Sequence, residues 1–416
     1  MRHELQGKVV ISTGHARLHL FYAAIVAQEA GLLSSLLTSF YLKEKWASLV
    51  ERLSKLSRKA FWKRLLLWRD YRLDEQVVVS LGSTELISRL CMWSKPRIPI
   101  KELRYWIERI DSLYYGKMAN RYINQHVKLI HSRSGFSRAV IPHAHRIGAK
   151  VLLEQSIAHP AFTRKMLQDE YDKWNIPTKH RVYASPEREM EWDINNCDYI
   201  LTNSEFCAGT IRQHLKRQKP ILVVPTGVDT DHFRPTATER RRDFRLLFVG
   251  NVDVRKGVAY AVEALKKLKL PRTKLLIVGR KSIDSPPVFD ETNYAVEYLP
   301  HVPYTMMPEI FRSADVFVFP SLSEGSARVV GEAMASGLCC IVTPNAGSII
   351  SDGIDGFIVP PRDINTLAER ILQVYENPDL AAEIGMSARK TAVERLTWRH
   401  YQENLLRVYM NILSTV

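Results

Sequence analysis

Short apolar runs alternate with helical stretches along the whole chain of 416 residues. In the first half the apolar runs are KVVIST, VKLIHS, AKVLLEQS, YILTNS and ILVVPT, and LHLFYAAIVAQEAG has helical spacing. The second half repeats this pattern with RLLFVG, a helix over residues 258–268, KLLIVG, AVEYLP, VFVFPS, CCIVTP and GFIVPP. Such alternation predicts parallel strands covered by helices. We therefore expect an α/β protein with two Rossmann-like domains.

The stretch TGVDTDHFRPTATERRRD interrupts this pattern between the two halves. Its glycine, its proline and its charged residues are typical of a linker. We place an N-terminal domain at residues 1–230 and a C-terminal domain at residues 236–395. The length of the chain also favours two domains over one core. The last segment, residues 397–416, has helical periodicity.

The stretch SEGSARVVGEAMASG places two glutamates, Glu324 and Glu332, eight positions apart. The buried strand VFVFPS precedes it, so Glu324 is expected on a tight loop and Glu332 about 12 Å further along a helix. A helix N-terminus suits a phosphate, and a carboxylate on either side could accept hydrogen bonds from sugar hydroxyls. This arrangement fits a nucleotide sugar, although spacing alone would favour two solvated glutamates, which are common in the first turns of helices.

A second candidate phosphate site lies in FVGNVDVRKGVAYAV. A strand ends at Gly250, a helix begins near Gly257, and Arg255 and Lys256 lie at the start of that helix. Two cations at this position would stabilise a diphosphate leaving group. The plainer interpretation is a pair of surface cations.

Four segments, SEFCAGTIRQHL, PTGVDTDHFRP, SEGSARVVGEAMASG and CCIVTPNAGSIISDGIDGFIVPPRD, resemble glycosyltransferase family 4, retaining enzymes of the two-domain GT-B fold. The resemblance implies that Glu324 contacts the donor sugar and that Glu332 holds the nucleotide ribose. It also implies that Arg255 and Lys256 neutralise the diphosphate, and that helix 397–416 crosses back to the first domain. The donor would be a UDP- or GDP-sugar, which is a substrate, and no cofactor is expected.

The chain departs from the family pattern at two places. Where many members have Arg after the first glycine, this chain has Asn251, and we expect Arg255 to supply that charge. Where members commonly read E-G-F-G, the chain has Gly325, Ser326 and Ala327 after the glutamate; these residues are small enough for the backbone to approach a phosphate. Arg328 has no assigned role. The nucleobase is expected against the loop near His301 and Val302.

The N-terminal domain should supply the acceptor side of the cleft. Gly14 is expected to let the chain turn tightly after the first strand. His159 follows the strand AKVLLEQS and resembles the family's histidine that contacts the donor sugar near the anomeric centre. Parallel sheets bind ligands at this edge. The reserve candidates are His15 and His145. The acidic segment Glu187, Glu189 and Glu191 resembles a cleft-lining segment, but a solvated turn would look the same.

Several function classes are disfavoured. The Asp229-Thr230-Asp231 triplet has the spacing of a metal-binding DxD, but the resemblance marks it as the domain crossover, so we expect no metal requirement. Five cysteines without CxxC spacing fit a reducing cytoplasm. No apolar run is long enough to span a bilayer, and the chain begins without a signal-peptide core. The rival classes are a GT-B sugar-nucleotide epimerase and a basic nucleic-acid-binding protein; no nucleic-acid module appears, so no nucleic-acid partner is expected.

Positive charge is concentrated in the first half. Residues 236–416 hold 22 Lys and Arg against 21 Asp and Glu, which leaves 37 against 23 for residues 1–235. Residues 43–72 interleave cations with Trp46, Phe61 and Trp68, a pattern typical of a helix on a membrane surface. We expect this helix to hold the protein on an anionic inner membrane face, near a glycan or lipid-linked acceptor of the cell envelope. Alternatively, its apolar side packs on its own domain.

Overall fold

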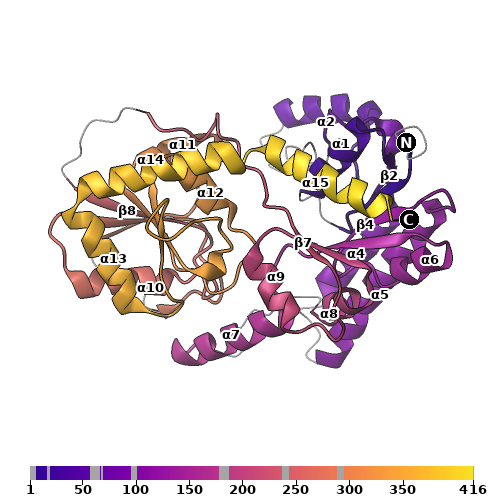
Figure 1. The fold of residues 1–416 in the computed structure, drawn as a ribbon. Helices are drawn as coiled ribbons and strands as arrows, with labels where there is room; N and C mark the ends of the chain where they lie inside the picture. The colour runs from indigo at the N-terminus through magenta and orange to yellow at the C-terminus, as the bar shows by residue number, and fades with distance from the viewer. Residues whose placement is uncertain are drawn as a thin grey trace.

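A computed structural model describes residues 6–15, 19–56, 66, 69–94, 101–177, 187–236, 243–287 and 295–415. Two parallel sheets, each covered by helices, form two domains that lie next to each other (Figure 1). The strands at the centre of both sheets are almost wholly buried, which explains their near-continuous apolar sequences. The predicted α/β architecture of two Rossmann-like domains is confirmed.

The N-terminal sheet has seven strands in the order β3-β2-β1-β4-β5-β6-β7, and every pair is parallel. Their bounds are β1 Val9–Ser12, β2 Leu33–Thr38, β3 Val78–Ser80, β4 Leu129–Arg133, β5 Lys150–Glu154, β6 Tyr199–Thr202 and β7 Ile221–Val223. Strands β2 and β3 were not predicted. The serines of β2 interrupt its apolar run, and β3 has only three residues.

Helices cover both faces of this sheet. One face packs against α1 (Leu20–Glu29) and α15 (Trp398–Leu413), and the other against α5 (Lys101–Ala119), α6 (Val140–Arg146), α8 (Glu187–Asn196) and α9 (Glu205–Arg212). Helix α4 (Gly82–Ser94) packs against α5. Helix α7 (Pro160–Lys173) follows β5 but extends along the C-terminal domain (Figure 1), where its Met166 packs against that domain's core.

The C-terminal sheet has six strands in the order β10-β9-β8-β11-β12-β13. Their bounds are β8 Phe244–Val249, β9 Thr273–Val278, β10 Val296–Leu299, β11 Val316–Phe319, β12 Cys339–Val342 and β13 Phe357–Ile358. The covering helices are α10 Val258–Leu268, α11 Met307–Arg312, α12 Arg328–Ala335, α13 Ile364–Glu376 and α14 Pro378–Arg395. The bounds of α10 agree with the helix predicted at residues 258–268.

The chain crosses between the domains twice, at two adjacent places. Val228 donates its backbone N–H to the carbonyl of Leu396 at 2.7 Å, which ties the outgoing linker to the returning C-terminal segment. Helix α15 then packs on α1, where Trp398 stacks on Tyr22 with ring centroids 3.9 Å apart. The predicted return of the C-terminal helix to the first domain is confirmed.

The predicted surface helix is only partly described. Helix α2 spans Glu44–Leu56, and residues 69–70 are not helical, so the structure does not show one continuous helix over residues 43–72. Within α2, Ala47 and Val50 are buried whereas Trp46 is 55% exposed. Phe61 and Trp68 lie outside the described residues.

Candidate functional site

Two loops meet at the carboxyl edge of the C-terminal sheet. Strands β8 and β11 are neighbours, with β9 on the far side of β8, so the strand order reverses direction between them. Ligands of open parallel sheets bind at such a switch point. The loop after β8 carries Arg255 and Lys256, and the loop after β11 carries Glu324. The topology thus places the two sequence motifs side by side.

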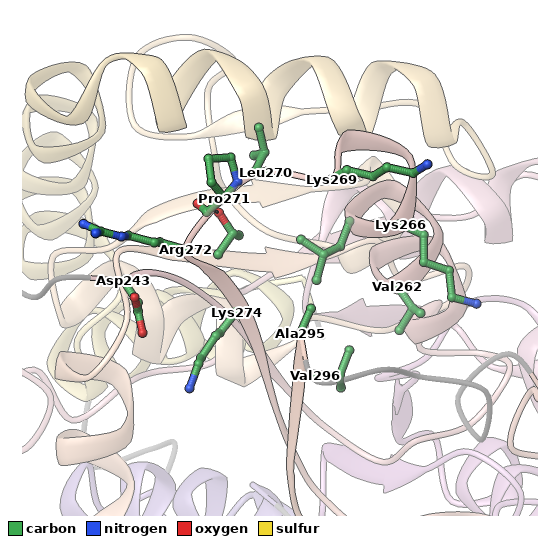
Figure 2. Close-up of a pocket in the computed structure, with 12 residues that line it drawn as sticks. Asp243, Val262, Lys266, Lys269, Leu270, Pro271, Arg272, Lys274, Ala295 and Val296 are labelled. Atoms are coloured by element: carbon green, nitrogen blue, oxygen red, sulfur yellow. Dashed lines mark hydrogen bonds between the residues drawn. The ribbon is translucent and has the colours of Figure 1, made fainter.

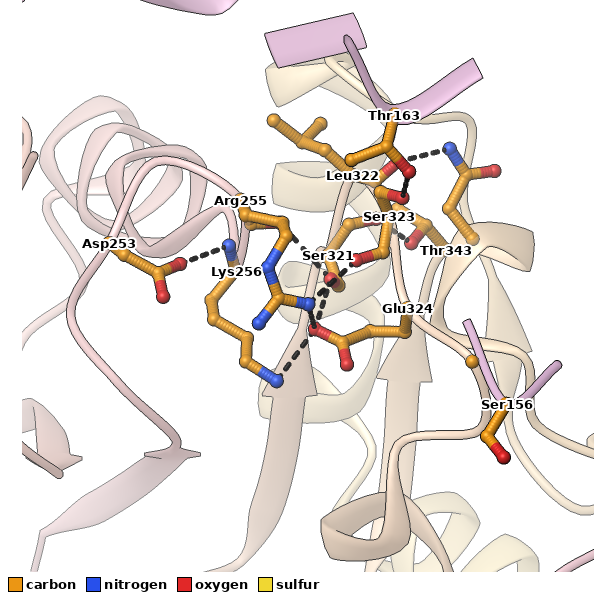
Figure 3. A network of polar contacts seen from close by, with 12 residues as sticks. Ser156, Thr163, Asp253, Arg255, Lys256, Ser321, Leu322, Ser323, Glu324 and Thr343 are labelled. Atoms are coloured by element: carbon orange, nitrogen blue, oxygen red, sulfur yellow. Dashed lines mark hydrogen bonds and ion pairs between the residues drawn. The ribbon is translucent and has the colours of Figure 1, made fainter. Parts of the chain in front are cut away.

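Both cations contact the same carboxylate oxygen. Arg255 Nη1 lies 2.6 Å from Glu324 Oε1, and Lys256 Nζ also lies 2.6 Å from that atom (Figure 3). The Glu324 side chain is 10% exposed, whereas that of Arg255 is 32% exposed, so the cluster is open to solvent from the arginine side. Burial opposes the charge on Arg255, but Glu324 and neighbouring aspartates outweigh it and raise the pKa of Arg255.

Hydrogen bonds fix the shape of the Glu324 loop. The Arg255 guanidinium also donates to the Ser323 carbonyl at 2.8 Å, and the Asn345 amide donates to the Leu322 carbonyl at 2.8 Å. The two loops approach closely at Gly257, where a Cβ would lie 2.0 Å from the Pro320 carbonyl oxygen. Because φ is +71° there, only glycine fits without strain. The loops therefore form one preorganised unit.

Asp253 belongs to the same loop as Arg255 and Lys256 and is hydrogen-bonded to its backbone. Its carboxylate accepts a hydrogen bond from the Lys256 backbone N–H at 2.8 Å (Figure 3) and is 8% exposed. Burial raises the pKa of Asp253 to about 6, although Arg255 and Lys256 oppose that shift. An anion bound by the two cations would raise this pKa further, because it would bring more negative charge close to the carboxyl.

Glu332 lies on α12, the helix that follows the Glu324 loop, and it is 4% exposed. Burial raises its pKa, and the positive charges of Arg328 and His232 partly oppose the shift. Arg328 Nε lies 3.6 Å from Glu332 Oε1, which accounts for a residue that the sequence left without a role. The His232 ring stacks on Tyr304, with centroids 5.4 Å apart. This aromatic pair comes from the linker and from the loop after β10.

The N-terminal domain closes against the Glu324 loop. A Cβ on Gly325 would lie 1.7 Å from the Ser156 carbonyl oxygen, so the backbones of the two domains are in direct contact. The Ser204 hydroxyl donates to the Gly325 carbonyl, and Thr163 Oγ1 lies 2.8 Å from Ser323 Oγ. The close approach of the neighbouring domain thus requires glycine at position 325.

His159 is the N-cap residue of α7. Its Nδ1 accepts the Ala161 backbone N–H at 3.2 Å, its ring stacks on His214 at 4.5 Å, and the residue is 3% exposed. Burial lowers the pKa of His159 to about 4. Its Nε2 is buried and has no hydrogen-bond partner among the described residues. In this conformation the ring is a neutral cap, and its contact with a donor sugar stays a prediction.

A buried network at the end of β5 was missed by the sequence analysis. Glu154 Oε1 lies 2.8 Å from His19 Nε2, and Glu154 Oε2 lies 2.9 Å from His131 Nε2. The Ser156 hydroxyl donates to Glu154 at 2.7 Å and lies 3.1 Å from His19 Nε2. Burial would raise the pKa of Glu154, but His19 and His131 outweigh it and hold that pKa well below its ordinary value. Through Ser156 this network adjoins Gly325.

The remaining predicted residues occupy varied places. Gly14 has φ +64° and packs on Phe136, Asn251 is exposed, and Gly250, Ser326 and Val302 are partly buried. The reserve histidines bind carboxylates: His15 contacts Asp111 at 3.1 Å, and His145 contacts Asp198 at 3.0 Å. In the acidic segment, Glu189 is fully buried beside Arg138, whereas Glu187 and Glu191 bind Arg164. Asp229 accepts the backbone N–H groups of Asp231 and His232.

A groove of about 690 Å³ lies elsewhere on the C-terminal domain (Figure 2). It is lined by residues from the end of α10 and the amino ends of β9 and β10, including Lys269, Arg272 and Lys274. The catalytic candidates Arg255 and Glu324 follow the carboxyl ends of strands, so they lie at the opposite edge of the same sheet. This groove is therefore separate from the candidate site.

Residues 243–377 match the family model described as Glycosyl transferases group 1. The chain is 26% identical over 253 residues to MMP alpha-(1->4)-mannosyltransferase of Mycolicibacterium hassiacum. This match covers 58% of this chain and 61% of that protein. It is 30% identical over 240 residues to the putative glycosyltransferase EpsD of Bacillus subtilis, covering 53% and 60% respectively. The matches thus span about three fifths of these curated relatives.

Solved structures agree over almost the whole chain. Sucrose-phosphate synthase from Thermosynechococcus elongatus has a TM-score of 0.67 at 16% identity and covers 99% of this chain and 100% of that one. Anabaena HepE in complex with UDP and glucose has a TM-score of 0.61 at 13% identity, covering 98% and 100%. The chain therefore has the GT-B fold, as predicted. Its C-terminal domain carries the similarity to glycosyl transferases group 1.

Proposed function

We propose that this protein is a retaining glycosyltransferase that moves a sugar from a nucleotide diphosphate donor to an acceptor hydroxyl. The observation that carries the proposal is the convergence of Arg255 and Lys256 on Glu324 at the switch point of the C-terminal sheet. The glycosyl transferases group 1 match over residues 243–377 includes all three side chains. The UDP- and glucose-bound relative of the same fold supports a nucleotide sugar as the donor class.

The cluster suggests how a donor is accommodated. Without a ligand, one carboxylate oxygen of Glu324 contacts both cations, and the cluster keeps an excess of positive charge. A diphosphate carries more negative charge than that carboxylate, so it competes for Arg255 and Lys256 and releases Glu324. The freed carboxylate can then accept hydrogen bonds from the hydroxyls of the donor sugar. When the glycosidic bond breaks, the two cations stabilise the extra charge that develops on the leaving diphosphate.

Glu332 would accept hydrogen bonds from the ribose hydroxyls, and the base would lie near Val302. A buried, hydrogen-bonded carboxylate at the ribose contributes about 1.5–3 kcal/mol to binding. A UDP- or GDP-sugar fits these roles. His159 would steady the reacting sugar once the cleft binds donor. The acceptor attacks from the face that the leaving group occupies, and a donor phosphate oxygen takes its proton.

The proposed mechanism needs no metal ion, because two protein cations take the place that a divalent ion would occupy. Transfer should therefore persist in EDTA. If EDTA abolishes transfer and magnesium or manganese restores it, the metal-free mechanism is wrong, and Asp229 and Asp231 become candidate ligands. Asp229 accepts the backbone N–H of Asp231, and substitution of both aspartates by asparagine would test that outcome directly.

Product analysis separates the proposal from its rival classes. A panel of UDP- and GDP-sugars is incubated with the protein and candidate glycan or lipid-linked acceptors, and released nucleoside diphosphate and glycosylated product are measured. Equal amounts of both support a transferase. An isomerised sugar nucleotide without transfer would instead indicate an epimerase. Salt-sensitive nucleic-acid binding with no affinity for any sugar nucleotide would favour the third class.

The acceptor would belong to cell-envelope polysaccharide or glycolipid synthesis. We base this part on charge: the first 235 residues carry an excess of 14 cations over anions, and the rest carry an excess of one. Such a domain favours an anionic surface or acceptor. Residues 43–72 are one proposed contact with the inner face of the membrane. Reversing Lys55, Arg58, Lys59 and Lys63 to glutamate should then weaken binding to anionic vesicles.

A further inference from the structure

Helices α4 and α5 expose large apolar side chains in two regular stripes. On α4 they are Leu86, Leu90 and Trp93, at spacings of four and three residues, and they are 63%, 58% and 63% exposed. On α5 they are Leu103, Trp106 and Ile110, at spacings of three and four residues, and they are 46%, 53% and 55% exposed. These spacings place each set on one side of its helix. We call the six residues the α4–α5 apolar surface.

The opposite sides of both helices are occupied by the protein itself. Ser88 on α4 donates to Asp111 on α5 at 3.2 Å, and Asp111 also binds His15 from the β1 loop. Further along α5, Tyr115 is fully buried in the core and donates to the Leu37 carbonyl. Each helix thus packs through one side and exposes large apolar side chains on another, and the two helices pack against each other. Exposed large apolar side chains that gather on adjacent helices can mark an interaction site.

Charge identifies the partner. Residues 43–119, which include α2, α4 and α5, carry 17 Lys and Arg against 9 Asp and Glu. Arg109 lies over the Trp106 ring at 5.2 Å, and Lys45 lies over the Trp46 ring at 5.8 Å. The Arg89 side chain, on α4 between Leu86 and Leu90, is 62% exposed. Tryptophan beside cations is typical of a polypeptide at the boundary between lipid headgroups and acyl chains.

We propose that the α4–α5 apolar surface inserts into an anionic lipid bilayer, with the surrounding cations binding the headgroups. No helix among the described residues has both the length and the hydropathy of a membrane span. In the proposed contact the helices lie along the bilayer surface, and their apolar side chains enter the boundary between headgroups and acyl chains. This assignment moves the membrane contact from residues 43–72 alone to a surface centred on α4 and α5. It does not depend on the proposed transferase activity.

The test is co-sedimentation of the full chain with phosphatidylglycerol vesicles and with pure phosphatidylcholine vesicles. The double variant Trp93→Ser, Trp106→Ser should lower binding to the anionic vesicles at least about tenfold, because each lost aromatic removes a large buried apolar area. The matched control is Ile283→Ser, Met386→Ser, which removes two side chains that are 62% and 57% exposed on the C-terminal domain. The control should bind like the wild type. Equal melting temperatures establish that the variants are folded.

Two further measurements complete the test: the salt dependence of binding by a charge variant, and the oligomeric state of the protein. Arg89→Glu should weaken binding severalfold in low salt and have less effect in about 0.5 M salt, where charges are screened. The proposal is overturned if the wild type binds neutral and anionic vesicles equally or binds neither. It is also overturned if the tryptophan variant binds like the wild type. A wild-type dimer that the tryptophan variant converts to a monomer in sedimentation equilibrium would show that a second copy covers this surface.

Discussion

The carboxyl edges of the two sheets hold their charges in opposite ways. In the C-terminal domain a partly exposed cluster joins Arg255 and Lys256 to Glu324, and both contacts measure 2.6 Å. In the N-terminal domain a buried carboxylate, Glu154, binds two histidines at 2.8 and 2.9 Å. The first arrangement has surplus positive charge and can exchange its carboxylate for an anion. The second is closed and neutralised within the protein.

This difference assigns separate tasks to the domains. Under the proposed function, the C-terminal edge binds and releases a charged donor, whereas the N-terminal edge provides a fixed wall against it. The contact between Ser156 and Gly325 joins the two edges, because a Cβ at position 325 would overlap the Ser156 carbonyl. Changes at the C-terminal cations should therefore affect catalysis most, and changes at the N-terminal network should affect stability most.

The strongest expected effect follows from removing a cation. Lys256→Ala should lower kcat by about 10²–10³, because a preorganised charge at the leaving group contributes roughly 2.7–4 kcal/mol in the transition state. Arg255→Ala should act in the same direction, and donor binding should weaken less than turnover in both variants. Steady-state kinetics and calorimetry measure the two quantities. The matched control is Lys266→Ala, in the last turn of α10, which should retain wild-type turnover.

Glu332→Ala should weaken binding of the donor nucleotide by about 1.5–3 kcal/mol, since the ribose hydroxyls lose a charged acceptor. Calorimetry with the nucleoside diphosphate measures this without any acceptor. Arg328→Ala tests the neighbouring cation separately, because its side chain is 59% exposed and contacts only one edge of the carboxylate. An unchanged dissociation constant in Glu332→Ala would remove this residue from the ribose site.

Gly325→Ala should separate the two edges. The added Cβ would lie 1.7 Å from the Ser156 carbonyl oxygen, so backbone atoms must move. Overpacking of this kind costs about 1–3 kcal/mol, and we expect lower transfer activity together with a lower melting temperature. Gly209→Ala, where no atom lies within 4 Å of the new Cβ, is the control. If both variants behave alike, the close approach of the domains is not needed for function.

The pKa of Asp253 is raised to about 6, so its effect on stability has a defined sign. An unfolded aspartate ionises near pH 3.9, whereas the folded one keeps its proton until about pH 6. Stability is therefore lost as pH rises from about 4 through 6. Asp253→Asn should remove that loss and raise the free energy of unfolding at pH 7.5 by roughly 1–3 kcal/mol, with little change at pH 4. Urea denaturation at both pH values measures it.

Glu154 should behave in the opposite sense. Its folded pKa is lowered by His19 and His131, so the stabilisation is present above the unfolded value of about 4.3 and is lost as pH falls. Glu154→Gln keeps the shape but cannot ionise, and its stability should fall by about 1 kcal/mol less than that of the wild type between pH 7 and pH 4. Glu369→Gln, on an exposed part of α13, is the control. Parallel acid curves for wild type and Glu154→Gln would contradict the ionised network.

The fold, and the loops after β8 and β11 that carry the candidate site, could be predicted because their signals are local in sequence. Buried parallel strands give continuous apolar runs, and each donor-site motif lies within one strand, loop and helix. The Glu154 network could not be predicted, because it assembles residues 19, 131, 154, 156 and 409 from separate elements. His159 was predicted as a site residue from its position after a strand. Its burial and its stacking on His214 depend on tertiary contacts, which the sequence does not show. Glu154, the last residue of β5, carried no spacing signal.

Calorimetric titration of UDP and GDP into the unmodified protein tests the central claim most directly. The account predicts that at least one of them binds in the absence of metal, and that Lys256→Ala and Glu332→Ala weaken the interaction while Lys266→Ala does not. It also predicts proton uptake near pH 6 on binding, because the diphosphate raises the pKa of Asp253. No binding of either nucleotide, or binding that these site variants leave unchanged, would contradict the assignment of the donor site to the loops after β8 and β11.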